Sequence, residues 1–282
     1  MKCILLIIMI VSFFLLETKA QVINKQTNHP GDTGRVQRAN KKYKELFGAP
    51  AVMSATDPEL MTILQRFIFG EVFYAGNLDD KTRELITITA LTTNQTLPQL
   101  KAHTNAALNI GVSPVEIREV VYTCAAFIGY PKVLNALDTI NSVFKSRGIK
   151  LPLESKGTIN ENERFEKGKE MQVPLYGEGM RKYMKDLPGN FSKTIPDMVT
   201  VSLFGDFYTR QGLGIKTREL MIFCALATLG GTERQMISHA VGNLKVGNSK
   251  ETLISAMVQC YPYIGFPRIS NAINVIKDAK VQ

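Results

Sequence analysis

The C-terminal half of this sequence repeats the N-terminal half. The stretch Lys81–Leu85, KTREL, returns unchanged as Lys216–Leu220, 135 residues later. After a one-residue insertion the matched positions lie 136 residues apart, and His103 corresponds to His239. Such self-similarity indicates that one structural unit occurs twice. The polar residues kept in both copies are therefore the first candidates for chemistry.

The first twenty residues belong to neither copy and resemble a secretory signal peptide. Lys2 precedes an apolar run from Ile4 to Leu16, and the small-x-small pattern Thr18–Ala20 follows. The run is short for a membrane span of ~20 residues, so an uncleaved anchor is the less favoured alternative. We expect a secreted or periplasmic protein that starts near Gln21 and has no stable membrane span after cleavage.

The composition is that of a globular protein, with 45% hydrophobic and 21% charged residues. The net charge of +9 comes from basic residues that are scattered and largely interleaved with acidic ones, and no basic stripe with base-stacking aromatic residues is present, which argues against nucleic-acid binding. A net positive charge favours anionic small molecules as partners. Three cysteines follow the signal peptide, Cys124, Cys224 and Cys260, and their apolar surroundings predict buried thiols rather than disulfides.

Helical periodicity dominates both copies and strand patterns are nearly absent, so we predict an all-α fold built from two tandem helical domains. The expected organisation is signal peptide 1–20, flexible leader and first helix 21–58, first repeat 59–150, linker 151–163 and second repeat 164–282. Asp79 and Asp80 are expected to cap the helix that carries KTREL. The next helix is expected to begin with a capping box, at Thr96–Gln99 in the first repeat and Thr232–Gln235 in the second.

A glutamate stands on the apolar face of the KTREL helix in both repeats. Glu84 shares its face with Ile88 and Leu91, and Glu219 is placed in the same way. A carboxylate in such a place is suited to proton transfer when burial shifts its pKa. The alternative is a salt bridge to a local basic residue, for which Arg83 and Lys81 are the candidates.

The two histidines outside the leader, His103 and His239, also occupy matched positions and lie on the packing face of their helix. A neutral buried histidine bonded to a carbonyl is the simple interpretation. The paired placement with Glu84 and Glu219 favours a proton-handling pocket. One histidine and one glutamate per copy form a thin ligand set, so we expect no metal site.

Three stretches of the first repeat resemble the carboxymuconolactone decarboxylase family, within the AhpD-like superfamily. They are Asp79–Leu85 (DDKTREL), His103–Val112 (HTNAALNIGV) and Tyr130–Ala136 (YPKVLNA), and the second repeat carries their counterparts. The resemblance spans roughly residues 60–145 and 195–278. It implies an all-α fold that assembles into rings, and for this tandem chain a homo-oligomer of three copies. It also implies chemistry without a cofactor.

The family has a peroxide-reducing branch and a decarboxylating branch. The redox branch carries two cysteines seven and four residues before the histidine, where this chain has Thr96 and Gln99, and again Thr232 and Gln235. The resemblance therefore favours an exported carboxy-lyase acting on a small carboxylated lactone or related anionic ring. Peroxiredoxin or alkylhydroperoxidase activity and non-catalytic ligand binding are the alternatives.

In the favoured function His103 or His239 supplies the proton that replaces the lost carboxylate. Glu84 or Glu219 orients the histidine or acts as base. Arg83 and Arg218, which precede these glutamates, are expected to bind the anionic substrate.

Overall fold

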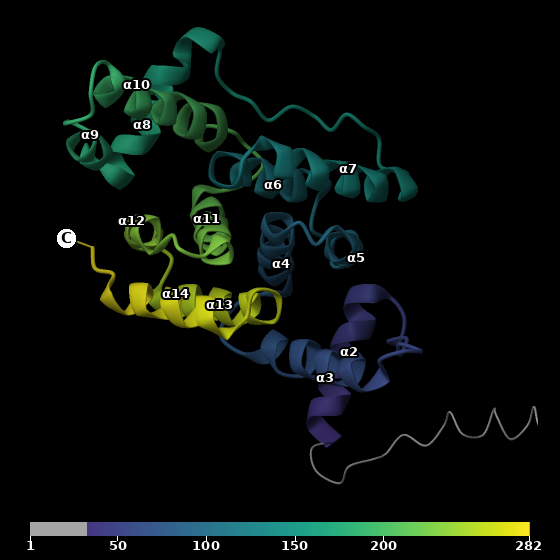
Figure 1. The fold of residues 1–282 in the computed structure, drawn as a ribbon. Helices are drawn as coiled ribbons and strands as arrows, with labels where there is room; N and C mark the ends of the chain where they lie inside the picture. Colours follow the sequence, from purple (N-terminus) through teal and green to yellow (C-terminus); the bar gives the residue numbers. More distant parts are fainter. Residues whose placement is uncertain (1–32, 282) are drawn as a thin grey trace, which may run out of the picture. The chain divides into compact units, whose positions relative to one another are not determined.

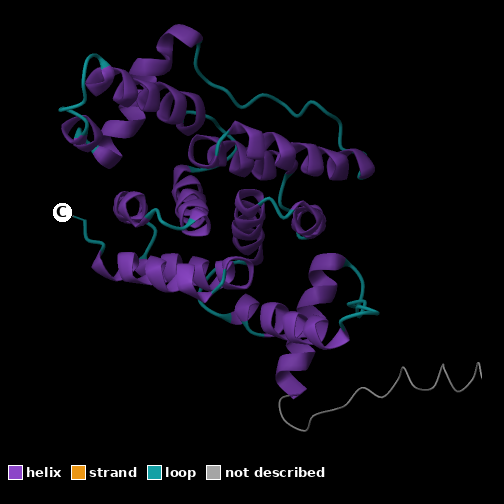
Figure 2. Ribbon diagram, in the orientation of Figure 1, coloured by secondary structure: helices purple, strands orange, loops and turns teal. Residues whose placement is uncertain are grey.

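The computed structural model describes residues 33–281, which form helices joined by loops (Figure 2). Thirteen α-helices and no strands occur in this part of the chain, which confirms the predicted all-α fold. The predicted signal peptide, residues 1–20, lies outside the described residues, as do residues 21–32 of the predicted leader.

The helices fall into two series, copy one from α2 to α7 and copy two from α8 to α14. Copy one contains α2 (Thr33–Phe47), α3 (Pro58–Gly70), η2 (Val72–Tyr74), α4 (Asp80–Asn94), α5 (Leu97–Asn109), α6 (Pro114–Ile128) and α7 (Tyr130–Ser146). Copy two, preceded by the 3-10 turn η3 (Glu161–Glu163), contains α8 (Arg164–Tyr176), α9 (Gly179–Tyr183), α10 (Phe191–Val199), the π-helix η4 (Thr200–Tyr208), α11 (Ile215–Leu229), α12 (Glu233–Lys245), α13 (Lys250–Ile264) and α14 (Phe266–Asp278). Residues 151–160 of the predicted linker carry no helix.

Side-chain caps fix where the helices that bear the site begin. The Asp79 carboxylate accepts the amide N–H of Thr82 at 2.7 Å and starts α4, as predicted. Ser113 and Glu116 form a reciprocal capping box at the start of α6. Because these caps satisfy otherwise unpaired amides, each helix begins at a defined residue.

The capping boxes predicted for α5 and α12 are wrong. Thr96 and Thr232 do precede these helices, but neither side chain bonds to an amide of the first turn. Thr232 has ψ of 21°, outside the extended region typical of a capping residue. Its hydroxyl instead donates to the carbonyl of Leu226 at 2.7 Å, in the helix before.

The helices α4 and α11 lie side by side and join the two copies (Figure 1). Each also packs against a helix of the other copy, α4 against α13 and α11 against α6. Most of the buried apolar side chains of both copies form one continuous cluster, and a smaller second cluster lies around α2 and α3. The two copies therefore share a core, and a residue of one copy can line a site of the other.

The repeat begins earlier than the sequence comparison indicated, because α2 corresponds to α8. Arg35 of α2 forms an ion pair with Glu71. Arg164 of α8 forms the matching pair with Asp206, in which the N–O distances are 2.5–2.6 Å. In both copies the first helix crosses a glycine where a Cβ atom would meet a carbonyl oxygen at 2.5–2.7 Å. The expected start of the first repeat at residue 59 therefore leaves out its first helix.

The end of this first helix is also docked in the same way in both copies. Asn109 donates to the carbonyl of Leu46 at 2.8 Å, and Lys245 donates to the carbonyl of Leu175 at 2.7 Å. Equivalent residues are 129 positions apart in α2 and α8, but 135 apart in α3 and α10. Copy two thus has six additional residues between these helices, in the stretch that contains α9.

Candidate active site

The structure brings Glu84 and His103 together in copy one. Glu84 on α4 is fully buried, and its Oε2 lies 2.9 Å from Nδ1 of His103 on α5. His103 is 7% exposed. The predicted pairing of glutamate and histidine is thus present, and neither Arg83 nor Lys81 forms an ion pair with Glu84 in the described part of the chain.

Aromatic rings from two other helices enclose this pair. Phe47, the last residue of α2, and Tyr263 of α13 both approach the imidazole of His103 edge-on, with ring centroids 5.7 Å apart in each case. Tyr263 belongs to copy two. The site of copy one is therefore completed by the other copy.

Copy two holds the equivalent pair in a similar arrangement. The Oε2 atom of Glu219, which is fully buried on α11, lies 3.1 Å from Nδ1 of His239 on α12. Phe127 of α6, in copy one, packs edge-on against His239 with ring centroids 5.3 Å apart. Phe127 and Tyr263 occupy matched positions, so each copy contributes an equivalent aromatic ring that packs against the histidine of the other copy.

Two tyrosines distinguish the site of copy two. The hydroxyl of Tyr176 lies 2.7 Å from both carboxylate oxygens of Glu219 and 2.8 Å from Nδ1 of His239. The hydroxyl of Tyr208 donates to Glu219 Oε1 at 2.5 Å. Burial raises the pKa of both phenols well above the usual value, and the charge of Glu219 adds to this effect. Both tyrosines therefore remain protonated and can donate to the carboxylate.

Phenylalanine occupies both tyrosine positions in copy one. Phe47 stands at the end of α2 as Tyr176 does at the end of α8, and Phe73 matches Tyr208. Accordingly, Glu84 Oε1 is buried without a hydrogen-bond partner among the described residues. The two sites share a glutamate and a histidine but differ in what holds the carboxylate.

The carboxylate contact determines which imidazole nitrogen can reach a substrate. A carboxylate accepts hydrogen bonds only, so it places a proton on Nδ1 of His239 and leaves Nε2 for other partners. Nε2 forms no hydrogen bond to another residue within the described range. The histidine can therefore exchange a proton at Nε2 while Glu219 balances its charge.

A cavity of about 710 Å³ opens beside this second pair. His239 and Tyr176 line it, together with the C-terminal end of α6 from copy one. The remaining wall comes from α9, from η4 and from the first turns of α12. A cavity of this size is in the range that holds small organic molecules.

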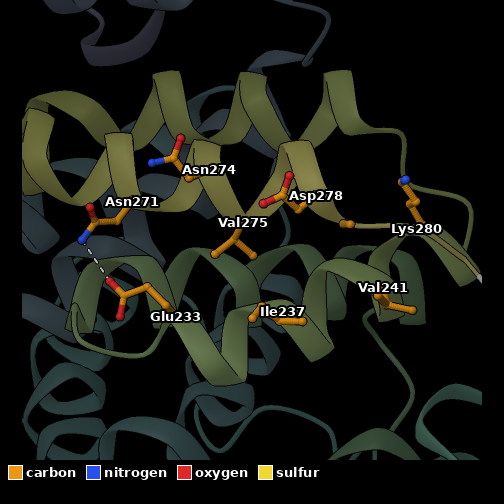
Figure 3. A pocket seen from close by; sticks show the side chains of 9 residues that line it. Glu233, Ile237, Val241, Asn271, Asn274, Val275, Asp278 and Lys280 are labelled. Atoms are coloured by element: carbon orange, nitrogen blue, oxygen red, sulfur yellow. Dashed lines mark hydrogen bonds between the residues drawn. The ribbon is translucent and has the colours of Figure 1, made fainter.

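A separate groove of about 590 Å³ runs between α12 and α14 (Figure 3). At one end the amide of Asn271 donates to Glu233 Oε1 at 2.9 Å, and Ile237 and Val275 line its middle. None of its lining residues belongs to the glutamate and histidine pairs. The groove therefore lies apart from the candidate chemistry.

Arg83 and Arg218, which we expect from the sequence to bind substrate, are buried and do not line the cavity beside His239. Arg83 is 1% exposed, and its guanidinium donates to three backbone carbonyls and to Oε1 of Gln259 at 2.6–3.2 Å. Arg218 is fully buried and donates to Oγ1 of Thr123 at 2.6 Å and to the carbonyls of Arg210 and Leu213. Each arginine thus ties a loop of its own copy to a helix of the other.

The cysteines lie in the core and form no disulfide among the described residues. Cys124, Cys224 and Cys260 are 0–1% exposed. Burial raises the pKa of the Cys124 thiol to about 12, so the reactive thiolate is scarce at neutral pH.

The described residues also contain no cluster of three or more candidate metal ligands. None of their helices is long and apolar enough to cross a membrane.

Sequence reasoning missed the aromatic residues around the pairs. A usable signal was present at the first helix, because Phe47 and Tyr176 both stand directly before a glycine with positive φ that ends the helix. Tyr263 and Phe127 occupy matched positions, but each contacts the histidine of the other copy, which is distant in the sequence. Only the shared core of the two copies brings them there.

Comparisons with known proteins match both copies to one family. Residues 58–141 and 195–278 match the profile of the Carboxymuconolactone decarboxylase family. The 4-carboxymuconolactone decarboxylase of Acinetobacter baylyi is 32% identical over 91 residues, which cover 32% of this chain and 68% of that protein. The nitrosuccinic acid decarboxylase npaB of Metarhizium robertsii is 31% identical over 94 residues, covering 32% of this chain and 66% of that protein. An uncharacterized 15.0 kDa protein of Paracoccus denitrificans is 38% identical over 78 residues, covering 27% of this chain and 58% of its own length.

Proposed function

Because the chain belongs to the carboxymuconolactone decarboxylase family, we propose that it is a decarboxylase acting on a small carboxylated lactone or a related anionic compound. Two of the similar proteins are named as decarboxylases, of 4-carboxymuconolactone and of nitrosuccinic acid. The observation that carries the proposal is the buried Glu219–His239 pair, whose histidine lines a cavity of small-molecule size.

The reaction needs a proton donor placed beside the carbon that loses the carboxylate. The bond between this carbon and the carboxylate breaks, carbon dioxide leaves, and the electron pair is delocalised into a conjugated carbonyl group or, in nitrosuccinate, into the nitro group. His239 then transfers its Nε2 proton to the carbon and regains a proton from solvent. Glu219 stabilises the protonated imidazole through Nδ1, and a positioned donor of this kind contributes typically 10²–10⁴-fold to a rate.

Tyr176 and Tyr208 act by holding Glu219. A carboxylate with three donors around it, two phenols and an imidazole, has a fixed orientation. It therefore fixes the ring plane of His239 and directs Nε2. Because copy one lacks both hydroxyls, we assign turnover to the site of copy two.

The proposal is tested by carbon dioxide release from 4-carboxymuconolactone and from nitrosuccinate, with H239A, H103A and the double variant. H239A is expected to lose activity by at least about 100-fold, because the proton donor is gone. H103A is expected to retain most of it. I237A is the matched control, since Ile237 is exposed on the same helix and lines the separate groove. Turnover that persists in the double variant would rule the proposal out.

The proposal includes export of the chain and assembly of three tandem copies. N-terminal sequencing of protein recovered from the medium or periplasm is expected to begin near Gln21. Light scattering of the purified protein measures the assembly, and a monomeric mass would contradict the trimer.

A further inference from the structure

Two features found in copy two and not in copy one meet at the cavity beside His239. The first is Arg234 on α12, whose counterpart in copy one is Pro98. The second is the six-residue extension of copy two, which lies in the stretch that contains α9 and its last residue, Tyr183. Arg234 and Tyr183 both line the cavity. Independent sequence differences that converge on one place indicate a function at that place.

The two side chains are in direct contact. The guanidinium carbon of Arg234 lies 3.5 Å from the centre of the Tyr183 ring, a close stacking distance. Stacking uses the face of the planar guanidinium and leaves its N–H groups free to donate at the edge. Arg234 forms no ion pair with a carboxylate in the described part of the chain. Its charge is thus available to a ligand.

The wall of the cavity formed by α12 is polar. Arg234, Gln235, Ser238 and His239 line it at the helical spacings i, i+1, i+4 and i+5. Arg234 and His239 are separated by ~7.5 Å along the helix axis at 1.5 Å per residue. The residues that line the cavity from other elements include the apolar side chains of Met180, Met184 and Leu203. The cavity is therefore suited to a small molecule with an apolar body, an anionic end at Arg234 and a reacting centre at His239.

We propose that Arg234, held by Tyr183, is the specificity-determining residue of copy two and binds an anionic group that the substrate keeps through the reaction. This inference rests on the proposed function. A carboxylate in an ion pair is stabilised in its charged form, whereas the carboxylate that leaves must lose its charge. The group on Arg234 is therefore the retained one, and the leaving carboxylate lies at the His239 end of the cavity. Copy one, with Pro98, lacks this selectivity.

Binding can be measured without turnover, which separates this inference from the proposed function. Isothermal titration calorimetry with malonate, succinate and glutarate is compared with the same titration of butyrate, for the wild type, R234Q, R234K and Y183L. The best-fitting dicarboxylate is expected to bind the wild type. Its affinity for R234Q is expected to be roughly 10- to 100-fold lower, because a charge-assisted pair is lost. R234K is expected to recover part of this affinity, and Y183L to lose part of it.

K169Q is the matched control, because Lys169 is exposed on α8 and forms no ion pair among the described residues. It removes the same charge and is expected to leave binding unchanged. If none of the three dicarboxylates binds, or if R234Q binds them as tightly as K169Q does, the inference is overturned. If dicarboxylates bind through Arg234 but no carbon dioxide is released from either substrate, the anion site stands and the proposed reaction fails.

Discussion

Tyr208 and Phe73 occupy the same position in the two copies, yet only Tyr208 reaches the neighbouring carboxylate with a hydrogen bond. Its hydroxyl lies 2.5 Å from Glu219 Oε1, whereas Glu84 Oε1 in copy one has no partner among the described residues. The duplicated site has therefore diverged in the groups that hold its glutamate. The two copies are structurally equivalent and chemically different.

The Tyr208 hydroxyl is expected to stabilise the folded protein. Y208F removes one donor to a charged acceptor, and Phe73 shows that a phenylalanine ring fits the position. A hydrogen bond to a charged group contributes about 1.5–3 kcal/mol, and Tyr176 remains to share the carboxylate, so a loss near the lower end is expected. The free energy of unfolding in urea measures this. An unchanged value would show that the short contact contributes nothing.

The reverse exchange in copy one supplies the matched test. F73Y is expected to place a hydroxyl near the unpaired Oε1 of Glu84 and to raise the free energy of unfolding by about 1 kcal/mol. Urea unfolding of F73Y and of the double exchange F73Y/Y208F measures this effect. A loss of stability in F73Y would show that copy one has no room for the hydroxyl.

Arg83 is expected to contribute to stability and not to substrate affinity. R83K keeps the positive charge but removes most of the donors to the three carbonyls and to Gln259. Several buried acceptors lose their hydrogen-bond partner, and each loss costs about 1–3 kcal/mol. The free energy of unfolding is therefore expected to fall by more than about 3 kcal/mol. Urea unfolding measures the stability, and KM measures the affinity. A raised KM with unchanged stability would restore the substrate-binding role.

The glutamate and histidine pairs could be predicted from the sequence, because each pair lies on two consecutive helices whose apolar faces are readable. Glu84 and His103 both stand on the buried face, and consecutive helices pack against each other. Arg83, next to Glu84 in the sequence, bonds elsewhere for a geometric reason. Neighbouring residues on a helix point about 100° apart, so adjacency to Glu84 did not put Arg83 in the same site.

The tyrosines could not be predicted in the same way. Tyr176 lies on a helix whose counterpart is displaced by six residues in the repeat, so the match with Phe47 was not visible at the main offset. Tyr263 reaches His103 only because α13 packs on α4 of the other copy. Contacts of this kind depend on how the copies share a core, which residue spacing alone does not determine.

The cysteines are expected to be unreactive in the folded protein. Cys124, Cys224 and Cys260 are 0–1% exposed, and burial raises the pKa of Cys124 to about 12. Iodoacetamide at pH 8 is expected to modify none of the three until urea unfolds the chain. Mass spectrometry of the peptides distinguishes them from Cys3, which lies outside the described residues. Rapid modification of any of the three in the native protein would revive the thiol-dependent peroxidase alternative.

The stability difference between the wild type and Y208F is expected to shrink at alkaline pH. Burial raises the pKa of Tyr208 in the folded protein, and the charge of Glu219 adds to this effect, while an unfolded tyrosine titrates near 10.0. Above pH 10 the unfolded state loses this proton and the folded state keeps it, so the stability contributed by Tyr208 falls as pH rises.

The expected slope is at most about 1.4 kcal/mol per pH unit for one such proton. Urea unfolding of the wild type and Y208F at pH 8, 9, 10 and 11 measures the difference, in which the other titrating groups largely cancel. The difference is expected to be constant from pH 8 to 9 and to decrease between pH 10 and 11. Arg218, whose pKa burial lowers to about 10, contributes in the opposite direction in both proteins. A difference that stayed constant up to pH 11 would show that Tyr208 ionises in the folded protein as readily as in the unfolded chain, and that its proton does not hold Glu219.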